Sequence, residues 1–138
     1  MKLALVLVLL INTAFAQDKK DNVIIAGPVP YNIIKSSLFQ NGYTFENNDT
    51  TYITTTSKEL SKGNMSVKFM FIRSDSNTVI SALGRYTIAI VVGGISTAPS
   101  DFERIDYRGM KGSPIKLAWA EMDRIAKLIS PIVTYDKR

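Results

Sequence analysis

The segment 65–73 constrains the fold most, because its side chains alternate with the period of two that is typical of a β-strand. One face of the predicted strand carries four apolar residues, so other elements must cover it. They are Met65, Val67, Phe69 and Phe71. A turn at 75–77 leads into a second apolar stretch, 78–92, where we expect Gly84 to mark a bulge, a bend or a junction between two strands. The two stretches predict antiparallel neighbours.

Two segments predict helices that are apolar on one side. The first, 31–41, ends at Gly42, a residue that readily takes the left-handed conformation that closes a helix. The second, 113–130, begins with Ser113-Pro114, a capping side chain followed by a residue suited to the first helical turn. Its apolar face includes Trp119, which we expect to be buried against the sheet.

Taken in order, these elements predict an α+β domain spanning residues 28–138. We expect an antiparallel sheet of three to five strands in helix–strands–helix order, with two helices packed on one face. Several other segments are expected to be irregular. They are a leader at 17–27, in which 23–26 is an edge strand or a packed arm, a connection at 57–64, a long stretch at 95–113 and a tail at 132–138.

Residues 1–16 predict a secretory signal peptide, with Lys2, an apolar run at 3–11, and Ala14 and Ala16 before a cleavage site. The run is shorter than the about 20 residues that a membrane-spanning helix needs, so we expect no membrane anchor. The chain has no cysteine, which removes both the lipid-attachment residue of a bacterial lipoprotein and the disulfides of small secreted domains. These features predict export to the periplasm or the cell exterior.

The chain also has no histidine, so Ser-His-Asp and Cys-His catalytic groups are excluded, as are zinc sites that need histidine or cysteine ligands. We predict neither a cofactor site nor a metal site. The formal net charge of +5 favours anionic partners, or serves solubility alone. Because an exported protein seldom meets nucleic acid, we expect an envelope protein or an anionic ligand as partner.

Basic residues gather before and within the start of the second predicted helix. They are the candidate ligand-binding residues: Arg104, Arg108, Lys111 and Lys116. A helix N-terminus and arginine side chains both suit an anion, although ordinary surface charge is the alternative interpretation. Three carboxylates lie in the same stretch, at Asp101, Glu103 and Asp106. They fit either glycosidase-like acid/base chemistry or local ion pairs that neutralise the basic residues.

Three motifs carry a resemblance to a known group: Asn41-Gly42-Tyr43, residues 108–114 and residues 118–126. With the order of elements over residues 28–130, they make the chain similar to small uncharacterised exported proteins of Gram-negative bacteria. Some of these have a TATA-binding-protein-like sheet with two helices on one face. The resemblance implies this two-layer fold and assigns no site residue. A DNA-binding role does not follow, because one architecture hosts many functions.

The sequence therefore favours a secreted or periplasmic, non-catalytic binding or accessory module that binds near residues 101–116. The alternative is a carboxylate-dependent hydrolase acting on cell-wall or glycan material. An enzyme of that kind should show a concave pocket in which two carboxylates face each other, whereas a binding module should show a flat or convex exposed patch that is apolar or basic.

Overall fold

The computed structural model describes residues 17–88, 91–96 and 100–138, so the predicted signal peptide at 1–16 lies outside the described residues. The helices are α1 (Tyr31–Gln40) and α2 (Pro114–Ile129). The strands are β1 (Val23–Ala26), β2 (Phe45–Asn48), β3 (Tyr52–Thr55), β4 (Lys58–Glu59), β5 (Met65–Arg73), β6 (Thr78–Tyr86), β7 (Val91–Val92), β8 (Ile95–Ser96), β9 (Glu103–Arg104) and β10 (Val133–Asp136).

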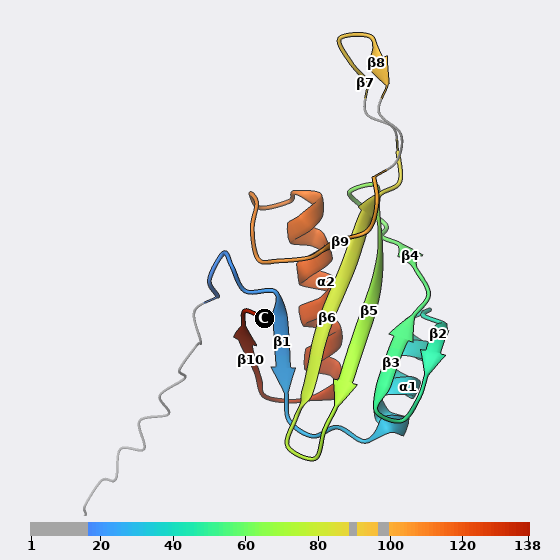
Figure 1. The fold of residues 1–138 in the computed structure, drawn as a ribbon, viewed down its shortest axis with the longest axis vertical. Coiled ribbons are helices and arrows are strands. Elements are labelled where there is room, and N and C mark those ends of the chain that lie inside the picture. The colour runs from blue at the N-terminus through green and yellow to red at the C-terminus, as the bar shows by residue number, and fades with distance from the viewer. Residues whose placement is uncertain (1–16, 89–90, 97–99) are drawn as a thin grey trace, which may run out of the picture.

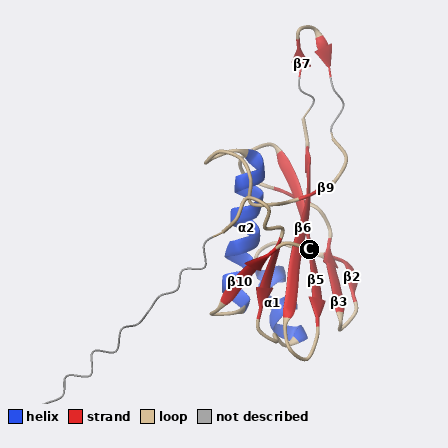
Figure 2. Ribbon diagram, turned by 60° about the vertical axis from the view of Figure 1, so that its left-hand side comes forward, coloured by secondary structure: helices blue, strands red, loops and turns tan. Residues whose placement is uncertain are grey.

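Eight of the strands form one antiparallel sheet, and both helices lie on the same side of it (Figures 1 and 2). The strand order is β10-β1-β6-β5-β3-β2, with β4 beside β5 and β9 beside β6. The long strands β5 and β6 form the centre and pair along their full length, from Met65 opposite Tyr86 to Arg73 opposite Thr78. Strands β7 and β8 form a separate hairpin.

The expected sheet of three to five strands in helix–strands–helix order is wrong, because the sheet has eight strands and strands also precede α1 and follow α2. The additional strands form in the expected leader, where 23–26 was an edge strand or a packed arm, in the two irregular segments 57–64 and 95–113, and in the expected tail. Strand β1 is not at an edge but lies between β10 and β6, and β10 forms from the expected tail. Strands β4 and β9 have two residues each, within the segments 57–64 and 95–113. Strands this short carry no periodic pattern, and their pairing depends on distant residues.

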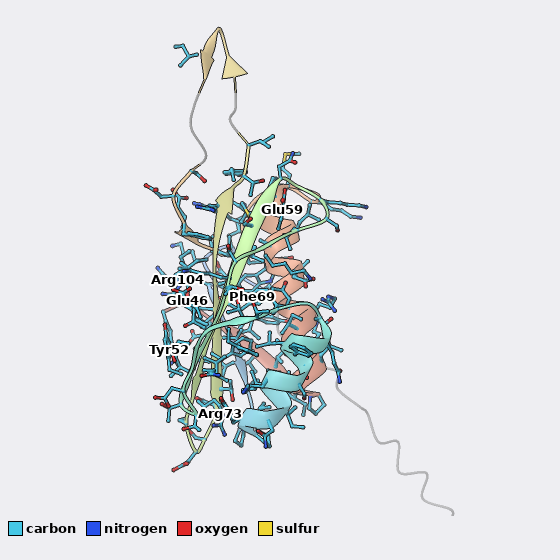
Figure 3. The ribbon with its side chains drawn as sticks, turned by 90° about the vertical axis from the view of Figure 1, so that its right-hand side faces the viewer. Glu46, Tyr52, Glu59, Phe69, Arg73 and Arg104 are labelled. Carbon is cyan, nitrogen blue, oxygen red and sulfur yellow. The ribbon has the colours of Figure 1, made fainter. Side chains whose placement is uncertain are left out.

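Strand β5 has the predicted bounds and the predicted apolar face, whose four side chains are all buried. Figure 3 shows Phe69 between the sheet and the helices, whereas Tyr52, Glu46 and Arg104 project from the opposite, uncovered side. Helix α2 covers the central strands with its buried apolar face, in which Trp119 is 2% exposed, as the sequence predicted. The core therefore forms between one face of the sheet and the two helices.

Gly84 has a different role from the one expected, since β6 pairs with β5 through this position without a bulge. A Cβ atom at Gly84 would lie 2.7 Å from Cδ1 of Ile105 and 3.0 Å from the sulfur of Met65. The glycine thus leaves room for Ile105, which follows β9 and is itself buried. The absence of a side chain here lets the chain leading to α2 pack on the sheet.

A partly exposed polar network ties α2 to the end of α1. The hydroxyl of Tyr43 donates to Oε1 of Glu121 over 3.0 Å, and Arg124 donates to both oxygens of the same carboxylate. Arg124 also donates to Oδ1 of Asn41, and Lys58 donates to the backbone oxygen of that residue. The hydrogen bonds from Arg124 lower the pKa of Glu121, and burial raises the pKa of Tyr43. The network therefore holds Glu121 as a charged acceptor.

Removing this carboxylate should destabilise the fold in a pH-dependent way. Glu121→Gln is expected to lower the free energy of unfolding at pH 7 by about 1–2 kcal/mol, since hydrogen bonds to a charged group are lost. Because the folded pKa of Glu121 lies below the unfolded value, its contribution is full above the unfolded pKa and disappears as the pH falls through the folded pKa. The difference between wild type and variant should therefore shrink below about pH 4.

Chemical denaturation at several pH values measures this difference. The control Glu46→Gln removes an exposed ion pair with Lys68, and should change stability by less than about 0.5 kcal/mol. A Glu121→Gln effect that stays constant between pH 7 and pH 3 would contradict a charged acceptor at this position.

Candidate functional site

A cavity of about 640 Å³ lies beside the first turns of α2. Three parts of the chain enclose it: Gln17, the loop 107–112 and α2 itself. In Figure 1 the loop, drawn in orange, and the first described residues, drawn in blue, lie beside the same helix. The backbone N–H of Tyr107 donates to the carbonyl oxygen of Asp21 over 2.8 Å, which joins the loop to the segment that follows Gln17.

Two glycines shape the loop that forms one wall of the cavity. Gly109 and Gly112 have φ angles of 95° and 83°, in the left-handed region that favours glycine. A Cβ atom at Gly109 would lie 2.6 Å from Oγ of Ser113, so the loop folds tightly back on the residue that caps α2. The loop is thereby held against the helix and presents Tyr107 and Lys111 to the cavity.

The aromatic wall of the cavity centres on Trp119. Its ring lies 5.7 Å from the ring of Tyr107 and 6.1 Å from that of Tyr135, measured between centroids. Its indole N–H donates to Oε1 of Gln17 over 3.1 Å, so its one polar group has a partner. Trp119 is therefore a core residue, as expected, and it also lines a cavity, which the sequence did not predict.

The charges around the cavity leave a positive excess. Asp123 accepts hydrogen bonds from the hydroxyl of Tyr135 over 2.8 Å and from Lys127 over 2.7 Å. The bond to Asp123 raises the pKa of Lys127, so this pair is charged and mutually satisfied. Lys116 places its ammonium 3.0 Å from the ring centroid of Tyr107. Within the described part of the chain, neither Lys111 nor Lys116 has an ion-pair partner.

The structure separates the four predicted ligand-binding residues into two pairs. Lys111 and Lys116 line the cavity beside Trp119. Arg104 and Arg108 instead border a hollow of about 70 Å³, and Nε of Arg108 lies 3.0 Å from Oδ1 of Asp106. The single cluster that the sequence indicated is therefore two separate sites, of which one has room for a ligand.

The start of α2 offers less to an anion than expected. Pro114 has no N–H, and Oγ of Ser113 accepts from the backbone N–H of Lys116 over 3.4 Å. Any anion in the cavity thus depends on the lysine side chains more than on the helix terminus.

The three candidate carboxylates do not meet in the cavity. Asp101 and Glu103 are exposed, and Asp106 lies beside Arg108. Among the described residues that line the cavity, Asp123 is the one carboxylate, and both of its oxygens already accept hydrogen bonds. The cavity therefore does not contain the pair of facing carboxylates that glycosidase-like hydrolysis needs.

Sequence reasoning missed Gln17, Tyr107 and Tyr135 as parts of this region. Gln17 lies in the predicted leader and Tyr135 in the predicted tail, and neither segment shows a periodic pattern. Tyr107 lies in the stretch that the sequence predicts to be irregular. All three depend on packing around Trp119 and on the pairing of β1 with β10, which no local pattern reveals.

Comparison of the chain with protein-family models, curated proteins and solved structures finds no match. The described residues contain no group of three or more carboxylate, histidine or cysteine side chains placed to hold a metal ion. Within the same part of the chain, no helix has both the length and the apolar character needed to cross a bilayer. The chemistry of the cavity is therefore the basis for assigning a function.

The contact between Gln17 and Trp119 can be tested directly, because Trp119 is the only tryptophan in the chain. Gln17→Ala removes the hydrogen-bond acceptor and opens the cavity wall. We expect a red shift of tryptophan emission, stronger quenching by acrylamide and a loss of about 1 kcal/mol in the free energy of unfolding. Lys20→Ala, an exposed change in the same segment, is the control. Identical spectra and quenching for Gln17→Ala and wild type would show that the contact is absent.

Proposed function

We propose that this protein is an exported, non-catalytic binding module that holds an amphipathic organic anion in the cavity beside Trp119. The observation that carries the proposal is the combination in one cavity of an apolar wall and two lysines without ion-pair partners among the described residues. Ligand sites in proteins commonly have this composition, with a mainly apolar lining and a few placed polar groups. The volume of about 640 Å³ falls within their usual range of roughly 300–1,000 Å³.

The lining supports a ligand that is partly apolar. Leu117 and Ala120 on α2 border the cavity together with the aromatic side chains. Trp119 is 2% exposed, and Lys116 occupies one face of the Tyr107 ring, so neither ring offers an open face on which a sugar could stack. These features favour an aliphatic or mixed apolar body over a neutral carbohydrate.

The lysines support an acid group on that ligand. A cation over an aromatic ring near the surface contributes about 0.5–1 kcal/mol, whereas a hydrogen bond to a charged group contributes about 1.5–3 kcal/mol. Lys116 therefore gains when its ammonium moves from the ring of Tyr107 to a carboxylate, sulfonate or phosphate. Lys111, which is exposed at the rim, provides a second contact to the same group.

Binding of 8-anilinonaphthalene-1-sulfonate, an aromatic anion, tests this proposal. Bound dye should quench Trp119, the single tryptophan of the chain, by energy transfer, and the dependence on the cavity lysines assigns the binding to this cavity. The double variant Lys111→Gln/Lys116→Gln is expected to weaken binding at least about tenfold, because the two charged contacts are lost.

The matched control is Arg85→Gln/Arg104→Gln, which removes two positive charges from side chains on β6 and β9 that do not line the cavity and should leave the affinity unchanged. The uncharged analogue N-phenyl-1-naphthylamine should bind wild type and the lysine variant equally. Equal dye affinity of wild type and the lysine variant, or an equal loss in the arginine control, would refute the proposed site.

A further inference from the structure

A second hollow, of about 250 Å³, lies beside α2 and is separated from the cavity beside Trp119 by Leu117 and Ala120. It is bordered by Leu60 and Lys62 from the segment between β4 and β5 and by residues of α2. Both hollows share two lining residues, Leu117 and Ala120. These two are three positions apart, so they are neighbours on the helix surface. Because Ala120 is small and exposed, only a low apolar ridge separates the hollows.

The segment that carries Lys62 packs closely on the start of α2. Gly63 has a φ angle of 90°, and a Cβ atom there would lie 3.2 Å from Cδ1 of Leu117 and 3.3 Å from Cα of Pro114. The glycine permits this approach, since a side chain would have to displace Leu117 or the helix backbone. Lys62 is consequently fixed beside the second hollow, although its own side chain is exposed.

When the carboxylates that already accept hydrogen bonds within the protein are set aside, the remaining charges along this surface are positive. Glu121 accepts from Arg124 and Tyr43, and Asp123 accepts from Lys127 and Tyr135. In the described part of the chain, Lys62 has no ion-pair partner, and the same is true of Lys111 and Lys116. An apolar ridge thus lies between lysines at both ends, with the neighbouring carboxylates already paired.

We infer that the ligand of this surface is an acidic, amphipathic segment of a partner polypeptide that lies across α2. An apolar side chain of the segment enters the cavity beside Trp119, and its carboxylates contact Lys111 and Lys116 on one side and Lys62 on the other. Charge complementarity carries the inference, together with the low apolar ridge of Leu117 and Ala120 between the two hollows. One small anion would fill only one hollow, whereas a segment of polypeptide can cross the ridge and reach both. The inference rests on the proposed function, since it names the class of ligand for the same cavity.

Fluorescence anisotropy tests the inference with a labelled peptide of twelve residues. In this peptide, pairs of acidic residues (Asp and Glu) alternate with pairs of leucines. The matched peptide carries Asn and Gln in place of the acidic residues. We expect the acidic peptide to bind and the amide peptide not to bind, with an affinity that falls as salt is added. Lys62→Glu should weaken the acidic peptide about fivefold or more and leave binding of 8-anilinonaphthalene-1-sulfonate unchanged. The control Lys137→Glu, the same charge change just after β10, should alter neither.

The outcomes separate this inference from the function on which it rests. If the dye binds with the predicted lysine dependence but the acidic peptide does not bind, the inference is wrong and the proposed function stands. If neither binds, both are wrong. Equal effects of Lys62→Glu and Lys137→Glu on the peptide would overturn the role of the second hollow. Binding to phosphatidylglycerol vesicles, with no binding of the peptide, would replace the polypeptide partner by a lipid surface and overturn the inference.

Discussion

The packing of α2 on the apolar face of β5 and β6 is the interaction on which the rest of the structure depends. A sheet with one largely apolar face cannot remain exposed to water, and α2, a helix of 16 residues, supplies a matching buried face. Trp119 extends this contact to both ends of the described chain, through Gln17 at one end and Tyr135 on β10 at the other. Burial of the core and formation of the cavity thus have a common cause, because Gln17 and Tyr107, which cover Trp119, also line the cavity.

The sequence allowed prediction of the elements whose burial repeats regularly. Strand β5 and both helices follow from alternation, helical spacing and capping residues, and their bounds agree with the structure to within one residue. The expected number of strands was wrong because β1, β4, β9 and β10 are short and are defined by their partners. Ile24, for example, pairs with Tyr135, far away in the sequence. The role of Gly84 could not be predicted from local sequence either, because it depends on Ile105, which comes from another segment.

Two of the four predicted ligand-binding residues line the cavity, and the other two do not, because their positions also depend on distant parts of the chain. Charge density drew attention to the residues before α2, and Lys111 and Lys116 do line a cavity. Arg104 and Arg108 carry the same local signal but lie at a different hollow, because β9 pairs with β6 and directs the chain there. Gln17 and Lys62 carry no local signal, since their positions depend on contacts with Trp119 and Leu117. Charge patterns identify candidate residues, and only the fold shows which of them share a surface.

Chemical-shift mapping can show whether an anion binds between the loop 107–112 and α2. The single tryptophan gives one indole N–H resonance, and that group lies at the cavity wall. During titration of ¹⁵N-labelled protein with 8-anilinonaphthalene-1-sulfonate, we expect the largest shifts at this indole resonance and at the amides of residues 107–120. Shifts concentrated on the uncovered face of the sheet, around Tyr52 and Ile72, with the indole resonance unmoved, would contradict the account.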